Sequence, residues 1–153
     1  MKLALAAAAL VVAAGPAAVA WPASGHIDSR SIALLAPPGG KTTEIAPPKG
    51  GPRASGAEFI STNAPLVDPK TKKRAGTMDA TETILSVTAD RVFLTARLAR
   101  GTLEATGERR HPGTVSTLAV TGGTGVYAGA RGTVALVDIG ETGGARLTFR
   151  LEG

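Results

Sequence analysis

Hydrophobic side chains after residue 20 recur mostly at every second position, which is the period of a β-strand. Residues 91–99 show the pattern best, with alternating apolar and mostly polar positions: Val92, Leu94, Ala96 and Leu98 against Arg91, Phe93, Thr95 and Arg97. Residues 145–152 alternate in the same way, so that Leu147, Phe149 and Leu151 share one face. Both segments are therefore expected to be strands that bury one face.

The same reading predicts about eight strands and no helix in the chain after residue 20. The expected strands are 30–36, 57–62, 77–88, 91–99, 102–106, 114–121, 131–139 and 145–152. Short strands joined by tight turns form antiparallel sheets, and about eight of them close into a barrel without exposed edges. We therefore expect an all-β, eight-stranded, up-and-down barrel or a related sandwich. Such a barrel has room inside for side chains or one small apolar ligand.

Two segments interrupt this pattern. Residues 37–56 hold five prolines and five glycines in twenty positions, which predicts a long flexible loop without a ladder of hydrogen bonds. Residues 63–69, with prolines at 65 and 69, are expected to form a turn.

The first twenty residues have the order of a secretory signal peptide. Lys2 precedes an apolar run over 3–14, Gly15 and Pro16 interrupt it, and Ala18-Val19-Ala20 provides a cleavage site. The rival interpretation, a membrane anchor, needs about 20 apolar residues, and this run is shorter. We expect cleavage after Ala20, a flexible N-terminus over 21–29, one barrel domain over 30–153, and a secreted or periplasmic protein. The Ala-, Gly- and Arg-rich composition suggests a bacterial source.

Composition narrows the function. The chain has no cysteine, which excludes a disulfide scaffold and a lipoprotein anchor. Its net charge is +5, or 5 − 1 = +4 once Lys2 is removed with the signal. The basic clusters at 70–74 and 109–111 are interpreted as solvated turns. Aromatic residues make up 3% of the chain, too few for a nucleic-acid stacking platform, so no nucleic-acid partner is expected.

Candidate chemistry is sparse. The two histidines, His26 and His111, are too few and too poorly placed for a zinc site or a serine–histidine–acid triad, so no metal is predicted. Residues 123–128 match the loose G-x-G-x-x-A pattern of dinucleotide binding, but the next segment alternates like a strand. We interpret 122–130 as a glycine-rich hairpin connection, and no cofactor is predicted.

Residues 118–132, LAVTGGTGVYAGARG, resemble the glycine-loop signature of the allene oxide cyclase and dirigent-like β-barrel superfamily. The segment from Phe59 to Ile84 and the strand at 103–107 resemble neighbouring parts of that pattern, so the likeness covers about 57–151. It implies an eight-stranded antiparallel barrel with a largely apolar cavity, and often a trimer. Plant members cyclise an unstable fatty-acid epoxide or steer the coupling of phenoxy radicals.

The resemblance also implies two ligand-binding residues. Asn63 falls where the cyclases hold a water-anchoring asparagine, and the alternative is an Asx-turn before Pro65. Arg131 matches an arginine that helps to form the dirigent pocket, and the alternative is a solvent-exposed arginine at a strand entry. The paired aspartates of the dirigent pattern are absent at 63–64, and the first expected strand lacks the glutamate of the cyclases.

Three functions remain open on the sequence. The first is a barrel that binds a small apolar or phenolic ligand without turnover. The second is an isomerase, cyclase or stereo-directing protein for an oxylipin or phenoxy radical, which needs a carboxylate inside the cavity; the candidates are Glu58, Asp79, Glu82 and Glu104. The third is a structural module that assembles through the outer face of the barrel. Whether the chain is an enzyme, and with which catalytic residues, stays open.

Overall fold

The computed structural model describes residues 30–45, 49–50, 54–111, 115–139 and 144–152. The expected signal peptide and N-terminal segment, residues 1–29, lie outside the described residues, as does His26. Within the described ranges the chain forms nine strands and one 3₁₀ turn, η1 (Gly125–Tyr127). The strands are β1 (Arg30–Ala36), β2 (Lys41–Ile45), β3 (Glu58–Val67), β4 (Arg74–Ser86), β5 (Ala89–Leu98), β6 (Gly101–Arg110), β7 (Ser116–Gly123), β8 (Gly132–Ile139) and β9 (Gly144–Leu151).

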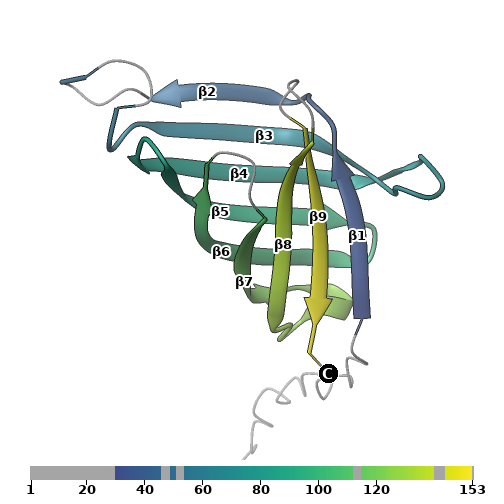
Figure 1. The fold of residues 1–153 in the computed structure, drawn as a ribbon. Coiled ribbons are helices and arrows are strands. Elements are labelled where there is room, and N and C mark those ends of the chain that lie inside the picture. Colours follow the sequence, from purple (N-terminus) through teal and green to yellow (C-terminus); the bar gives the residue numbers. More distant parts are fainter. Residues whose placement is uncertain (1–29, 46–48, 51–53, 112–114, 140–143, 153) are drawn as a thin grey trace, which may run out of the picture.

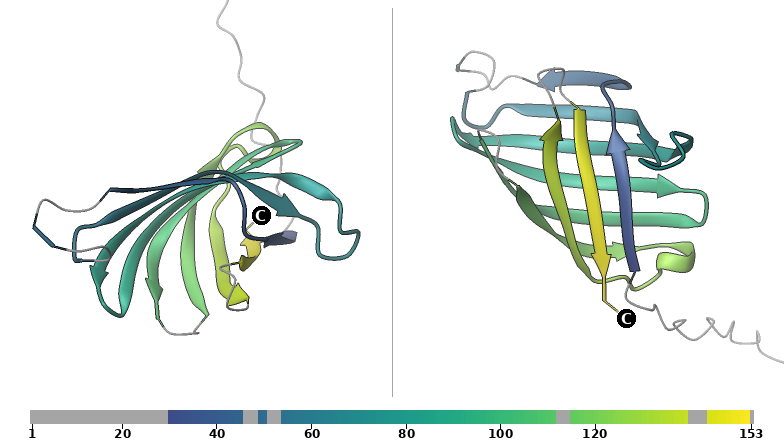
Figure 2. Two further views of the ribbon diagram at one scale, coloured as in Figure 1. Left: turned by 90° about the horizontal axis from the view of Figure 1, so that it is seen from above. Right: turned by 45° about the vertical axis from the view of Figure 1, so that its right-hand side comes forward.

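The strands form one curled antiparallel sheet in the order β1-β9-β8-β7-β6-β5-β4-β3-β2 (Figure 1). A pairing of Leu35 in β1 with Val67 in β3 links the first strand of this order to the last strand but one. This pairing closes an eight-stranded barrel and leaves β2 as an extra strand beside β3. The two further views in Figure 2 show how β8, β9 and β1 curl round to face the long strands β3–β6. The expected all-β, eight-stranded antiparallel barrel is confirmed, and it consists of strands β1 and β3–β9.

Alternation places one face of each strand inside the barrel, as the period-two pattern predicted. The core consists of leucine, valine, alanine and phenylalanine side chains from every strand of the barrel. Phe149 on β9 is the largest fully buried side chain among the described residues and packs with Leu103 and Leu118 in the same cluster. Burial of such side chains is worth about 1.5–3 kcal/mol each, and it holds the fold together without disulfides.

The turn expected at 63–69 is wrong for residues 63–67, because β3 continues to Val67. The strand tolerates Pro65 since β2 pairs only as far as Thr62, so the missing N–H of Pro65 falls where no ladder partner lies on that side. A bulge between Ser61 and Ala64 contains Asn63, whose backbone has a left-handed φ of 55°. Pro65, which lies next to this bulge, therefore marks an irregular part of β3 and not the end of the strand.

The flexible loop expected at 37–56 is likewise wrong for Lys41–Ile45, which form β2. This short run carries Thr42, Thr43 and Ile45, β-branched residues that suit a strand, and pairs with residues 58–62. All five of its residues are exposed. Because β2 buries neither face, its sequence lacks the alternation of apolar and polar residues that identifies the other strands.

The glycine-rich segment 122–130 connects β7 to β8 through η1, with no helix after it of the kind a dinucleotide site needs. Gly125 has φ of 61°, and a Cβ there would collide with the carbonyl oxygen of Arg100. The glycines thus let the connection fold tightly against the β5–β6 turn. In the part of the chain that the structure describes, no helix is long and apolar enough to cross a membrane.

Candidate functional site

A cavity of about 250 Å³ lies at one end of the barrel, inside the curled sheet. Its wall is about half apolar and half polar, and much of it comes from inward-facing positions of the central strands. The principal apolar side chains are Ala64, Met78, Ala80, Val92, Leu94 and Leu136. The β1–β2 connection at 37–39 and Thr42 of β2 complete the rim, so the extra strand contributes to the cavity. Phe149, Leu103 and Leu118 of the core do not line it.

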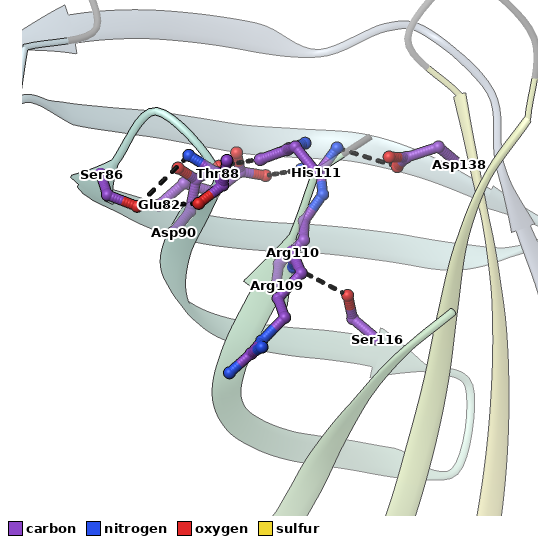
Figure 3. A network of polar contacts seen from close by, with 9 residues as sticks. All are labelled: Glu82, Ser86, Thr88, Asp90, Arg109, Arg110, His111, Ser116 and Asp138. Carbon is purple, nitrogen blue, oxygen red and sulfur yellow. Dashed lines mark hydrogen bonds and ion pairs between the residues drawn. The ribbon is translucent and has the colours of Figure 1, made fainter. Parts of the chain in front are cut away.

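One wall of the cavity is charged. Arg109 near the end of β6 donates from Nη1 to Glu82 Oε1 of β4 at 2.9 Å and from Nη2 to Asp138 Oδ1 of β8 at 2.8 Å. Figure 3 shows Arg109 between the two carboxylates. The Arg109 side chain is 19% exposed, while Glu82 and Asp138 are 30% and 31% exposed. These three residues, called the charged wall below, join β4, β6 and β8 across the barrel.

A second polar pair lies beside the charged wall (Figure 3). Asp90 of β5 is 1% exposed, and its Oδ2 is 2.5 Å from Nε2 of His111. The backbone N–H of His111 donates to the carbonyl of Thr88 at 2.9 Å, which holds the histidine over the start of β5. A buried carboxylate needs such a partner, because an unpaired buried charge is strongly destabilising.

The interpretation of residues 109–111 as solvated turn residues is therefore wrong for Arg109, which is mostly buried in a strand. His111 does lie at a bend after β6, but its side chain is paired with Asp90 and partly buried. Strand β6 extends to Arg110, four residues beyond the predicted end at 106. The inward register of Leu103 and Ala105 consequently continues to Arg109. Arg110 faces the other way and is exposed, with Nε donating to Glu108 Oε1 at 2.9 Å.

Of the four candidate carboxylates, the structure brings Glu82 into the cavity. Glu58, Asp79 and Glu104 are not part of its lining. Asp138 was missed, although it follows Val134 and Leu136 at the inward parity of a predicted strand. Asp138 and Asp90 both lie at every second position in line with inward-facing apolar residues, and a charged residue in that series was the signal that could have found them.

The two residues named by the resemblance lie away from this cavity's lining. Asn63 is exposed at the β3 bulge, where its backbone N–H donates to Asp79 Oδ1 at 2.9 Å. Arg131 is exposed at the entry to β8, and its Nη1 donates to the carbonyls of Thr121 at 2.9 Å and Ala130 at 2.8 Å. The charged wall does not include them, and a ligand contact for either residue stays a prediction.

The Asn63 bulge is held by electrostatics on the barrel exterior. The hydrogen bond from the backbone N–H of Asn63, and then the one from Arg97, lower the pKa of Asp79 below its ordinary value. Arg97 Nη2 lies 2.6 Å from Asp79 Oδ2. Asp79 is thus ionised at neutral pH and fixes the left-handed turn of the backbone at Asn63.

Within the described ranges, no group of three or more histidine, cysteine, aspartate or glutamate side chains is arranged to hold a metal ion. The polar side chains of the cavity lining are two carboxylates, one guanidinium and the hydroxyls of Thr42 and Ser61, beside the apolar side chains named above. Such a wall binds polar groups and can accept or return a proton.

Comparisons with known proteins place the fold. No protein-family model matches the chain, and no curated protein matches it. A solved structure named as a pyocyanin demethylase is 22% identical with a TM-score of 0.65, and the match covers 80% of this chain and 100% of that one. An exo-specific intermolecular Diels-Alderase is 16% identical with a TM-score of 0.65, over 82% of this chain and 99% of that one.

A pterocarpan synthase dirigent protein is 20% identical with a TM-score of 0.61, and the match covers 81% of this chain and 92% of that one. The chain therefore has the allene oxide cyclase and dirigent-like barrel fold, as the motif at 118–132 predicted. At these identities the likeness concerns the fold alone.

Proposed function

We propose that this protein binds a small, mostly apolar or phenolic ligand in the cavity at the charged end of the barrel. The observation that carries the proposal is a cavity of about 250 Å³ whose lining combines apolar side chains with a few polar groups, among them the charged wall. Ligand sites are typically apolar clefts with a few convergent polar groups, and they span about 300–1,000 Å³ for drug-sized ligands. The cavity lies just below that range, which favours a compact ligand.

The structural neighbours agree with this proposal. Their names describe proteins that act on small organic molecules, and they share this barrel at TM-scores of 0.61–0.65. A barrel with a packed core at one end and a cavity at the other can bind such a molecule. The core around Phe149 supplies stability, and the hollow end is free to accept a ligand.

The test is a thermal-shift screen with fatty acids and two-ring phenols, run on the mature protein and two variants. Ala80→Phe fills the cavity from its lining, and Ala119→Phe adds the same ring on the exposed face of β7. Ligand at about 100 times its Kd stabilises a folded protein by about 2.7 kcal/mol. We expect that stabilisation in the wild type and Ala119→Phe, but not in Ala80→Phe. A flat response across the panel, or equal binding by Ala80→Phe, would overturn the proposal.

The position of Glu82 and Asp138 favours a second candidate, an isomerase, cyclase or stereo-directing protein for an unstable oxylipin or phenoxy radical. A carboxylate inside an apolar cavity can take a proton from a reactive ligand and return it at another atom. The cavity would add orientation and exclusion of water. The test is chiral chromatography of the products formed when the substrate is generated in the presence of protein. Racemic products, identical with and without protein, would exclude this candidate.

Export and assembly remain further proposals. The order of residues 1–20 supports a cleaved secretory signal and delivery of the barrel outside the cytoplasm. N-terminal sequencing of protein from culture fractions tests this, and a mature chain that retains residue 1 would contradict it. The barrel resemblance supports a homo-oligomer, which light scattering after gel filtration tests directly.

A further inference from the structure

The charged wall has an unequal balance of charge. Glu82 and Asp138 carry −1 each and Arg109 carries +1, which gives −1 for the ionised side chains lining the cavity. The whole chain, by contrast, is +5. The cavity is therefore negative inside a positive protein, and the partial burial of these three side chains strengthens that field by lowering the local dielectric constant.

Arg109 is held by the two carboxylates through both of its terminal nitrogens. Its Nη1 and Nη2 each donate to one carboxylate, and its Nε is buried without a hydrogen-bond partner in the described part of the chain. At 19% exposure its side chain is also buried to a greater fraction than the carboxylates, which are 30% and 31% exposed. The guanidinium therefore acts mainly as a fixed counter-ion that positions Glu82 and Asp138.

The carboxylates, in contrast, keep free acceptor capacity. Each gives one oxygen to Arg109, Oε1 of Glu82 and Oδ1 of Asp138. The second oxygen of each, Oε2 and Oδ2, receives no hydrogen bond from any other residue that the structure describes. A ligand in the cavity can therefore donate hydrogen bonds to these acceptor oxygens.

We propose that the cavity selects ligands whose polar end is a hydrogen-bond donor, above all a cationic one such as a protonated amine, which Glu82 and Asp138 accept. This inference rests on the proposed ligand-binding function and specifies its chemistry. An anionic end would face a net negative wall and leave its own charge unpaired in a partly buried cavity, which is costly. Fatty-acid carboxylates are consequently disfavoured, while phenols bind through the hydroxyl as a donor.

The test uses three probes that share one ring system and differ in their polar end: 1-naphthylmethylamine, 1-naphthalenemethanol and 1-naphthoate. Calorimetric titration at pH 7 is expected to give the tightest binding for the ammonium, then the alcohol, then the carboxylate. We expect at least tenfold between the first and the last. Added salt is expected to weaken the ammonium and to strengthen the carboxylate.

The variant Glu82→Gln with Asp138→Asn changes the wall from −1 to +1 and is expected to reverse the order of the probes. The matched control, Glu58→Gln with Glu104→Gln, removes two carboxylates outside the cavity lining and is expected to keep the wild-type order. Circular dichroism checks that both variants fold. Should the wall variant not fold, the salt dependence of the wild type decides the question.

The outcomes distinguish the selectivity proposal from the underlying proposal of ligand binding. If the carboxylate probe binds wild type as tightly as the ammonium, or if salt affects both alike, the selectivity proposal is overturned while ligand binding stands. If the control pair reverses the order as the wall variant does, the preference comes from the overall charge of the protein, and the selectivity proposal also fails. If none of the probes binds the wild type, both proposals fail together.

Discussion

Replacing Arg109 by methionine tests how strongly the charged wall depends on its one cation. Methionine keeps much of the length of the side chain but removes both donors, at 2.9 Å to Glu82 and 2.8 Å to Asp138. Two carboxylates would then share one end of the barrel without a counter-charge. The variant is therefore expected to be less stable at neutral pH.

The magnitude follows from partial burial. Removing one partner of a fully buried ion pair costs about 3–5 kcal/mol. An exposed pair is worth only about 0.2–1 kcal/mol. Arg109 is 19% exposed and its partners 30% and 31%, so the wall lies between these limits. We expect a loss of about 2 kcal/mol, which lowers Tm by roughly 8 °C in a domain of this size.

Urea unfolding followed by far-UV circular dichroism measures the loss. The informative comparison is the triple variant Arg109→Met, Glu82→Gln, Asp138→Asn, which removes the repulsion together with the cation. It is expected to recover most of the lost stability. If the single and triple variants are equally destabilised, the loss comes from packing of the arginine stem and the electrostatic reasoning is wrong. A loss below about 0.5 kcal/mol, within the range of an exposed pair, would refute it as well.

Three further predictions concern the rest of the barrel. Phe149→Ala is expected to cost about 3–5 kcal/mol in urea unfolding, because the ring is fully buried; a loss under 1 kcal/mol would contradict its place in the core. Asn63→Ala is expected to cost about 1–2 kcal/mol because of its left-handed φ, whereas Asn63→Gly should be nearly neutral; equal losses would refute this. The lowered pKa of Asp79 means that its stabilisation is full above the pKa of the unfolded chain and disappears as pH falls through the lower folded value. Asp79→Asn should therefore melt below wild type at pH 7 and converge with it in strong acid, which thermal melts across pH test.

Much of the fold could be predicted because burial leaves a period-two trace in the sequence. Strands with a fully buried inner face, such as β5 and β9, matched the alternation closely. The strand β2 could not be recognised this way, since it buries neither face and lies among prolines and glycines. The path of β3 through Pro65 was also hidden, because the sequence does not reveal that its neighbour β2 stops pairing at Thr62.

The candidate site was harder to predict for a related reason. Glu82 could be named from its place in a predicted strand, but its partners come from β6 and β8, and only closure of the barrel brings them together. Arg109 looked like part of a basic turn because the predicted strand ended at residue 106. If the alternation of inward-facing residues in β6 had been continued through positions 107 and 109, Arg109 would have been predicted to face the inside of the barrel.

The central claim is that the hollow end of this barrel binds a small ligand, and an NMR titration tests it most directly. Increasing amounts of 2-naphthol would be added to ¹⁵N-labelled mature protein while the backbone amide shifts are followed. The account predicts saturable shifts concentrated on β4, β5 and β8 around Ala80, Leu94 and Leu136. It also predicts that the shifts vanish in Ala80→Phe. Shifts spread over the outer face, or none up to the solubility of the probe, would contradict it.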